Sequence, residues 1–95
     1  MKISDLRAGL RRVDISGTII EVSPTRDVVT RYGEARVATA TLSDESGEIN
    51  LTLWNEQIDQ VSVGDSVQIE NGYVTEFRRE PQLNVGRYGS LTVLQ

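Results

Sequence analysis

A chain of 95 residues, 38% hydrophobic and 25% charged, suits one domain that buries a single core, and it is too short for two. No run approaches the roughly 18 apolar residues of a membrane span, and the N-terminus lacks an apolar core of signal-peptide length. Cysteine and histidine are absent, which excludes disulfides and thiol chemistry and removes the commonest general base and transition-metal ligand. We therefore expect a cytoplasmic, intracellular protein that binds no cofactor or metal and is not an enzyme. Carboxylate-only chemistry stays possible in principle.

The net charge of −4 is distributed unevenly along the chain. Residues 37–77 contain eight acidic and no basic residues, whereas the remainder contains ten basic and six acidic residues and so carries +4. Nine of the ten basic residues are arginine, which binds phosphate bidentately and stacks on bases. The total charge argues against a nucleic-acid partner, but its segregation argues for one.

The N-terminal part predicts a plug followed by a long, bent strand. Residues 2–10 are expected to form a short turn, with Ile3 and Leu6 inward, that closes one end of the fold. Residues 12–22 predict a strand whose inward parity slips near Gly17, as at a β-bulge or sharp bend. A long first strand that serves two sheets is how a small barrel closes.

Residues 23–35 predict a long hairpin arm that begins with a proline turn. Arginines alternate along it with residues that offer apolar or stacking surface, and the set is Arg26, Val28, Thr30, Arg31, Tyr32 and Arg36. A solvated loop with ordinary surface charge is the alternative.

A tight turn at residues 44–47 predicts that strands 36–43 and 48–54 form an antiparallel pair. The residues expected to face the core are Ala38, Ala40, Leu42, Ile49, Leu51 and Leu53. Trp54, the only tryptophan, falls on the opposite, polar face. A ring held there by a sheet is a candidate stacking platform for a nucleobase, and a lid over the core is the alternative.

Residues 55–61 predict a short helix capped by Asn55 that seals the barrel bottom with Ile58 and Val61.

Residues 66–74 predict the fourth strand, with Val67 and Ile69 inward. If Gly72 marks a bulge, Tyr73 turns outward, onto the face that carries Trp54.

The remaining residues predict a hairpin loop and a last strand. Residues 75–81 are expected to form the loop, which carries Phe77 beside Arg78 and Arg79; packing of Phe77 under its own loop is the alternative. Residues 82–93 predict the strand, with Gln82 and Asn84 outward and a kink at residues 86–89 that holds Arg87 and Tyr88. The residues expected to face the core are Leu83, Val85, Leu91 and Val93.

Five short strands, a helical turn after the third, long arms after the first and fourth, and no βαβ spacing predict an all-β fold. The expected architecture is a five-stranded OB-fold Greek-key barrel with a short helix between strands three and four. In that fold the ligand crosses the second and third strands between two long loops, where Trp54, Tyr73 and Phe77 are expected. Rings interleaved with arginines suit single-stranded nucleic acid.

The sequence also resembles a known family. The runs that carry the resemblance are SDESGEINLTLWNEQ and VGDSVQIENGYVTEFRREPQLNVGRYG, preceded by MKISDLRAGLRRVDISGTIIEVS. They closely resemble the single-stranded DNA-binding domains of archaeal replication protein A, the simple archaeal single-stranded DNA-binding proteins and their human relatives in the sensor-of-ssDNA complex. The specific parts are D-E-S-G before L-T-L-W, I-E-N-G-Y with phenylalanine four residues later, and Q-L-N-V-G. Some relatives have tryptophan at the position of Tyr73.

The resemblance implies that Trp54, Tyr73 and Phe77 stack on bases, that the arm touches the strand, and that Gln82 lies beside its path. The expected nucleic-acid-binding residues are Trp54, Tyr73, Phe77, Arg26, Val28, Thr30, Arg31, Arg78, Arg79, Gln82 and Asn84.

The expected function is non-catalytic binding of single-stranded DNA in replication, repair or recombination, by one domain spanning residues 1–95 in a nucleoid-associated protein. Further expected partners are other replication or repair proteins, or further OB domains of the same chain, but no membrane. One alternative is a structural OB-fold subunit or domain that mediates protein–protein contacts in a replication protein A-like complex. Another is an RNA-binding barrel of the anticodon-reading kind. The sequence leaves open the site size, the cooperativity, the oligomeric state and whether the chain is a fragment of a longer protein.

Overall fold

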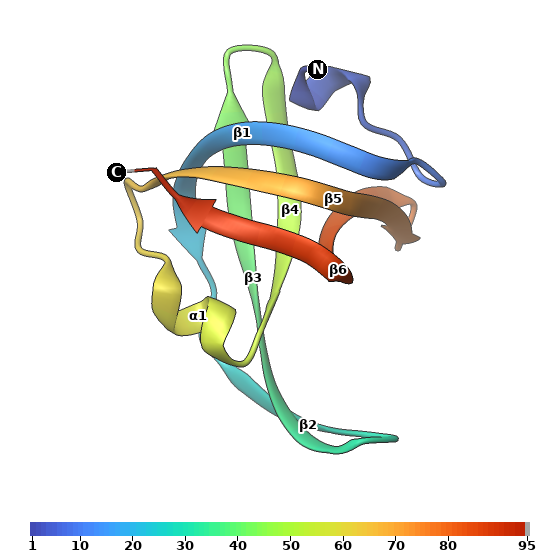
Figure 1. The fold of residues 1–95 in the computed structure, drawn as a ribbon, viewed down its shortest axis with the longest axis vertical. Coiled ribbons are helices and arrows are strands. Elements are labelled where there is room, and N and C mark those ends of the chain that lie inside the picture. Colours follow the sequence, from blue (N-terminus) through green and yellow to red (C-terminus); the bar gives the residue numbers. More distant parts are fainter. Residues whose placement is uncertain (95) are drawn as a thin grey trace.

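The computed structural model describes residues 1–94, apart from the side chain of Arg87 in the predicted kink, and six strands of this chain form one sheet that closes on itself (Figure 1). The strands are β1 (Arg11–Val22), β2 (Arg26–Thr30), β3 (Gly33–Asp44), β4 (Gly47–Trp54), β5 (Ser66–Phe77) and β6 (Glu80–Val93). They follow the order β1-β5-β6-β4-β3-β2, and an additional pairing of β1 with β3 closes a ring of five strands. The predicted barrel is therefore confirmed, and β2 is the outgoing half of the predicted arm.

The bend in β1 closes the ring. Thr18 pairs with Ser66 of β5 and also with Ser43 of β3, so the strand passes from one neighbour to the other at this residue. The register shifts between Ile19 and Glu21, close to the predicted slip. A Cβ atom on Gly17 would lie 2.8 Å from the Ser43 carbonyl oxygen, so only glycine permits this approach of the two strands.

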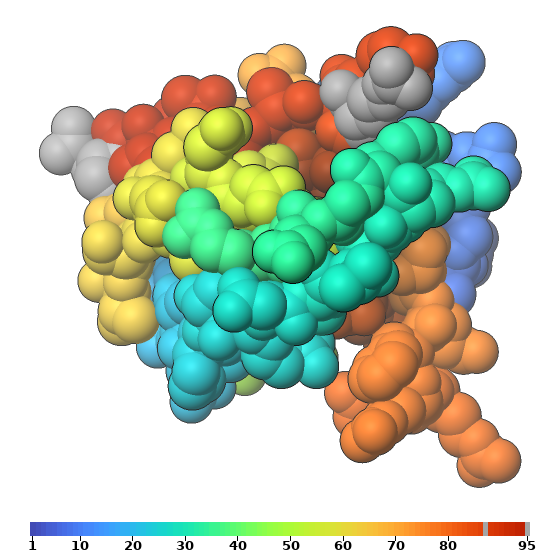
Figure 2. Space-filling model, turned by 90° about the horizontal axis from the view of Figure 1, so that it is seen from below, coloured from blue at the N-terminus to red at the C-terminus, as the bar shows by residue number. Residues whose placement is uncertain are grey.

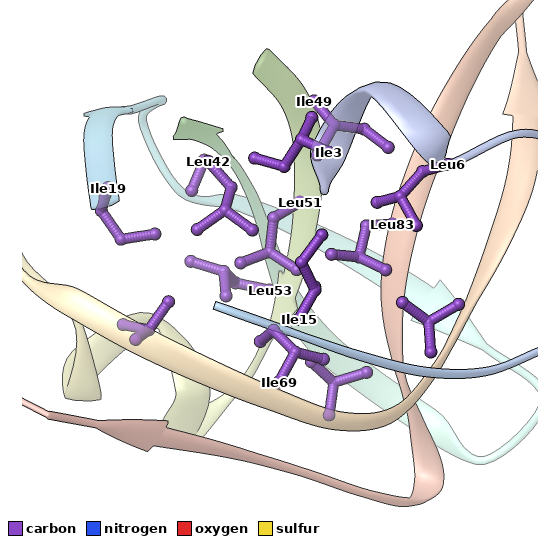
Figure 3. Close-up of a cluster of buried hydrophobic side chains, with 14 of the residues drawn as sticks. Ile3, Leu6, Ile15, Ile19, Leu42, Ile49, Leu51, Leu53, Ile69 and Leu83 are labelled. Atoms are coloured by element: carbon purple, nitrogen blue, oxygen red, sulfur yellow. The ribbon is translucent and has the colours of Figure 1, made fainter. Parts of the chain in front are cut away.

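The core fills the ring, and Figure 3 shows its side chains converging from the strands and the N-terminal segment. The N-terminal plug is a 3-10 helix, η1 (Ile3–Asp5), and its Ile3 is buried with Leu6 as predicted. The predicted inward residues of the strands are also buried, namely Ala38, Ala40, Leu42, Ile49, Leu51, Leu53, Val67, Ile69, Leu83 and Val85. Each large side chain contributes roughly 1.5–3 kcal/mol by its burial. The prediction for Val93 is wrong, because it ends β6 on the exposed surface, whereas Leu91 packs against the core.

The predicted helix is α1 (Glu56–Gln60), between β4 and β5. Ile58 packs against the core and Val61 is buried within it, so this segment seals one end of the barrel. The predicted capping role of Asn55 is wrong: Asn55 occupies the N-cap position with a φ of 51°, but its side chain forms no cap hydrogen bond. Within residues 1–94 the helical segments have three and five residues, far fewer than a membrane crossing needs.

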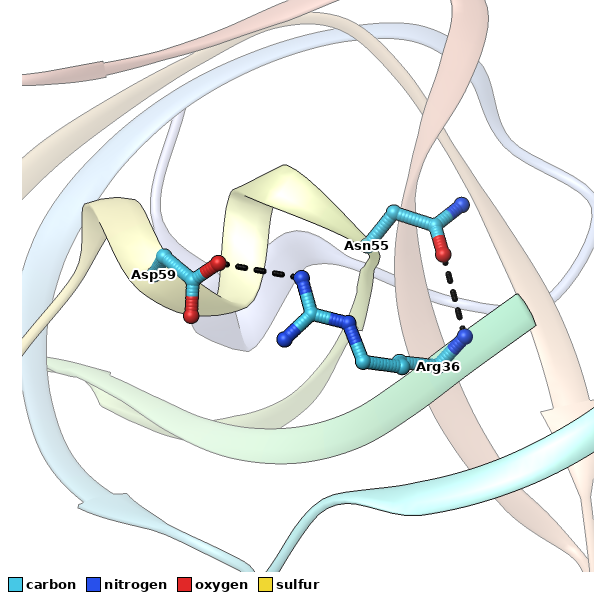
Figure 4. A network of polar contacts seen from close by, with 3 residues as sticks. All are labelled: Arg36, Asn55 and Asp59. Atoms are coloured by element: carbon cyan, nitrogen blue, oxygen red, sulfur yellow. Dashed lines mark hydrogen bonds and ion pairs between the residues drawn. The ribbon is translucent and has the colours of Figure 1, made fainter.

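The Asn55 side chain instead accepts a hydrogen bond from Arg36 (Figure 4). The Arg36 backbone N–H donates to Oδ1 of Asn55 at 3.0 Å, and its guanidinium forms an ion pair with Asp59 of α1, also at 3.0 Å. The hydrogen bond to Asp59 raises the pKa of Arg36. Since both charged groups are solvent-exposed, the ion pair orients the helix more than it stabilises the fold.

Asp44 ties the β3–β4 turn to the N-terminal plug. Its Oδ1 accepts hydrogen bonds from the Ser46 hydroxyl at 2.6 Å and the Ser46 backbone N–H at 2.7 Å, and its Oδ2 accepts one from the Ile3 N–H at 2.9 Å. These donors, the Ser46 hydroxyl foremost, lower the pKa of Asp44 to about 2. One ionised carboxylate thus organises two segments 41 residues apart.

We predict an acid-sensitive contribution to stability from Asp44. Its pKa falls from 3.8 to about 2 on folding, so its stabilising effect is complete above pH ~5 and is lost as the pH falls through 4 to 2. As the pH falls through that range, the free energy of unfolding of Asp44→Asn should therefore decrease less than that of the parent. Urea denaturation at several pH values measures both. Glu45→Gln, in the same turn, is the matched control. Parallel curves for the parent and Asp44→Asn would contradict the prediction.

Candidate nucleic-acid interface

The pairing register of β4, β6 and β5 determines which side chains lie on the outer face of the barrel wall. Thr52 pairs with Asn84, and Asn84 pairs in turn with Tyr73, so these three residues form one row across the wall. Residues that are paired across strands project from the same face. The adjacent row, which includes Leu83 and Val74, is buried in the core. The row with Tyr73 therefore faces outward.

Three aromatic side chains project from this outer face. Trp54 lies two residues beyond Thr52 on β4, and Phe77 lies four residues beyond Tyr73 on β5, so alternation keeps all three rings on one face. Trp54 is 37% exposed, Tyr73 40% and Phe77 59%. The alternatives of a core lid for Trp54 and a packed loop residue for Phe77 are therefore wrong. The Trp54 backbone N–H donates to Oε1 of Gln57 at 3.0 Å, which fixes the end of β4.

The predicted arm continues this face away from the barrel. Arg26 of β2 pairs with Val37 of β3, and Val37 pairs with Trp54, which places Arg26 in the row of the tryptophan. Val28 and Thr30 follow at alternate positions and share that face. Three of the predicted binding residues are thereby aligned with Trp54.

The arm tip and Trp54 enclose a cleft of about 820 Å³, here called the Trp54 cleft. Residues of the arm that line it include Thr30, Arg31 and Tyr32. The Thr30 hydroxyl accepts from the Tyr32 N–H at 3.1 Å and donates to the Gly33 carbonyl at 2.9 Å, so it shapes the turn. The Arg31 guanidinium lies 6.0 Å from the centre of the Tyr32 ring.

The predicted loop at residues 75–81 is wrong. β5 continues to Phe77 and β6 starts at Glu80, which leaves Arg78 and Arg79 as a two-residue turn. The end of the β5–β6 hairpin, orange in Figure 2, projects from the body of the molecule. The φ angles of Arg78 and Arg79 are 53° and 69°, as in a type I′ hairpin, where asparagine and glycine are the usual residues. The Arg78 guanidinium lies 5.2 Å from the centre of the Phe77 ring, in a cation–π contact. The turn thus carries two arginines, of which Arg78 lies against an exposed ring.

The remaining predicted residues form a polar strip between the rings. The Asn84 side-chain amide donates to Oγ1 of Thr75 at 3.0 Å and to the Gln82 carbonyl at 3.1 Å. Gln82 pairs with Asn50 of β4 and with Thr75 of β5, so it faces outward in the next row. Amide groups therefore lie on the surface between Tyr73 and Phe77.

Gly86 is a site residue that sequence reasoning missed. A Cβ atom there would lie 3.1 Å from a ring carbon of Tyr73, so the ring rests over the glycine backbone. Gly86 also lines the Trp54 cleft and so connects Trp54 with Tyr73. A glycine inside a strand indicates that another group approaches the backbone closely, but the sequence does not show that this group is the Tyr73 ring.

We predict that the arginine turn is held at a cost to stability. Arg78→Asn combined with Arg79→Gly should raise the free energy of unfolding by about 1–2 kcal/mol, since left-handed backbone strain is relieved at two positions. Urea denaturation measures the change. Arg78→Ala with Arg79→Ala removes the same side chains without relieving the strain, and should give no such gain. Equal effects of the two double variants would contradict this account.

Known proteins resemble this chain in both sequence and fold. Residues 13–91 match the family described as OB-fold nucleic acid binding domain. The chain is 32% identical, over 90% of its length, to the single-stranded DNA binding protein Ssb of Saccharolobus solfataricus, and spans 57% of that protein. It aligns over its full length with the OB domain of a Thermoplasma acidophilum protein, with a TM-score of 0.86, 20% identity and 86% of that chain covered. It also aligns over its full length with the second OB-fold domain of replication protein A from Methanococcus maripaludis, with a TM-score of 0.80, 26% identity and 94% of that chain covered.

Proposed function

Because the chain belongs to the family of OB-fold nucleic acid binding domains, we propose that it binds single-stranded DNA in replication, repair or recombination. Bases stack on Trp54, Tyr73 and Phe77, and arginines contact the phosphates. The observation that carries the proposal is the exposure of three rings on one face of a wall whose other face is the core. Likeness to a single-stranded DNA binding protein supports the choice of ligand. Stacking requires no catalytic step, in agreement with a family of binding domains.

The spacing of the rings favours a strand that runs along the wall. Tyr73 and Phe77 are four residues apart on one strand, which is about 13 Å at roughly 3.3 Å per residue. This exceeds the distance between stacked neighbouring bases, so each ring takes its own base. The polar strip of Gln82 and Asn84 lies between them and offers hydrogen bonds to the intervening nucleotide. Each stacked base contributes roughly 1–3 kcal/mol with little base preference.

The charges near the rings separate bases from phosphates. Glu34 and Glu56 line the Trp54 cleft together with Arg31, so carboxylates outnumber guanidiniums there and a base suits the interior better than a phosphate does. Arg36 is engaged by Asp59. The phosphate contacts are therefore assigned to Arg26 and Arg31 on the arm and to the arginine turn at residues 78–79. Figure 2 shows the arm in teal and the end of the β5–β6 hairpin in orange.

Ring substitution tests the stacking. Because Trp54 is the only tryptophan, its fluorescence should be quenched when oligo-dT is added to the parent protein. Tyr73→Ala and Phe77→Ala should each weaken binding roughly 5- to 150-fold, as expected for the loss of one stacked base. Val63→Ala, at an exposed position in the turn before β5, is the control.

Unchanged Trp54 fluorescence at low salt and saturating oligomer would refute the proposal. A folded domain that binds no oligonucleotide but co-purifies with another subunit would favour the scaffold role instead. Tighter binding to RNA than to DNA of equal length would favour the RNA-binding role.

The salt dependence of binding tests the phosphate contacts. Each phosphate neutralised on a single strand contributes about −0.7 to the slope of log K against log salt. Arg78→Ala with Arg79→Ala should therefore make the slope shallower by about 1.4, whereas Arg7→Ala, an exposed arginine of the N-terminal segment, should leave it unchanged. Fluorescence titrations between low and moderate salt measure both. A slope that stays the same in the double variant would remove the turn from the phosphate path.

A further inference from the structure

A second cleft lies on the far side of Tyr73 and has a volume of about 450 Å³. The residues that matter in its lining are Arg11, Arg12, Asn71, Tyr73, Gly86 and Tyr88. Tyr88 is 83% exposed. This feature, here called the Tyr88 cleft, combines two guanidiniums with two rings, the composition that suits a nucleotide.

A β-bulge brings both arginines to the cleft. Arg11 pairs with Tyr73, so it extends the outward row from β5 onto β1. The register then shifts between Arg11 and Val13, and Arg12 has a φ of 56°. Neighbouring residues of a regular strand point to opposite faces, but a bulge re-aims one of them. Arg11 and Arg12 consequently line the same cleft.

A second bulge, in β6, positions Tyr88. The pairing passes from Glu70 with Ser90 to Gly72 with Val85, so residues 86–89 bend outward opposite Asn71, whose φ is 56°. The Asn71 N–H donates to Oδ1 of Asp14 at 2.9 Å, and its side-chain amide donates to the Tyr88 carbonyl at 3.4 Å. A Cβ atom on Gly89 would lie 2.8 Å from the Glu70 carbonyl oxygen, so the bend in β6 is pressed against β5. The backbone beneath Tyr88 is therefore held in place.

The Tyr88 cleft is continuous with the proposed stacking surface. Gly86 lines both this cleft and the Trp54 cleft, and the Tyr73 ring rests over Gly86 between them. The charges of the two clefts differ: two carboxylates and Arg31 line the Trp54 cleft, whereas the described residues that line the Tyr88 cleft include two arginines and no carboxylate. A strand whose base stacks on Tyr73 thus meets two cations as it leaves the ring.

We propose that the Tyr88 cleft binds one further nucleotide of the same single strand, with its phosphate on Arg11 and Arg12 and its base against Tyr88. This inference rests on the proposed function, and it extends the path from β4, β6 and β5 onto β1 and the bend of β6.

The test is the dependence of affinity on oligomer length. The 95-residue protein is titrated with oligo-dT of increasing length, and binding is followed by Trp54 fluorescence. Tyr88→Ala should leave the affinity for short oligomers unchanged and lower it roughly 5- to 150-fold once the oligomer is long enough to reach the cleft. Tyr88→Phe keeps the ring and should bind as the parent does.

The arginines are tested in the same titration. Arg11→Ala with Arg12→Gly removes both guanidiniums and leaves a residue that tolerates a positive φ at position 12. Since the two arginines share one phosphate, this variant should make the salt slope shallower by about 0.7, for long oligomers only. Thermal melts confirm that each variant folds.

The outcomes of these titrations distinguish failure of the proposed function from failure of the Tyr88 cleft alone. If the parent binds no oligomer of any length, both the proposed function and this inference fail. If it binds, but the Tyr88 and arginine variants keep the parent's dependence on length and salt, only the Tyr88 cleft is overturned. A uniform loss at every length would also overturn it, because it would indicate an effect on the shared surface rather than on an additional nucleotide.

Discussion

The alternation of side chains across β4, β5 and β6 is the constraint on which the proposed binding face depends. Leu83 and Val74 pair on the inner face, and Asn84 and Tyr73, one residue away on the same strands, pair on the outer face. A slip of one residue would exchange the two faces, burying the tyrosine and exposing the core. The free energy of core burial therefore also fixes the direction in which the rings point. On the proposed path, rings that the wall already holds in place lose little conformational entropy when bases stack on them, which favours affinity.

Non-glycine residues in left-handed backbone conformations accompany all three rings. Asn55 follows Trp54, Asn71 precedes Tyr73 by two residues, and Arg78 follows Phe77. Such conformations cost of order 1–3 kcal/mol each and persist where the surrounding structure over-determines them. Here hydrogen bonds from Arg36 to Asn55 and from Asn71 to Asp14 supply that support. The strained positions therefore lie directly after β4, inside β5 and in the β5–β6 turn.

How much the sequence predicts depends on how local the determinant is. Strand parity is local, so the inward residues of β4 and the outward turn of Tyr73 at Gly72 were predicted correctly. The arginine turn carries no glycine or asparagine, so its two-residue geometry left no signal and a longer loop was expected. The capping prediction for Asn55 failed because Arg36, 19 residues away in sequence on the neighbouring strand β3, donates a hydrogen bond to the side chain. The kink at residues 86–89 that carries Tyr88 was predicted, but the bulge that brings Arg11 and Arg12 to the same cleft left no local signal.

The acidic net charge is compatible with the proposed ligand once the charges are placed in space. Carboxylates of Glu34 and Glu56 lie in the cleft beside Trp54, whereas arginines occupy the arm, the turn after Phe77 and the start of β1. A duplex presents phosphates outward and hides its bases, so it would meet the carboxylates without gaining the stacking. An unpaired strand can turn its bases toward the rings and its phosphates toward the arginines. On the proposed path, discrimination between the two forms of DNA follows from where the acids lie and not from the total charge.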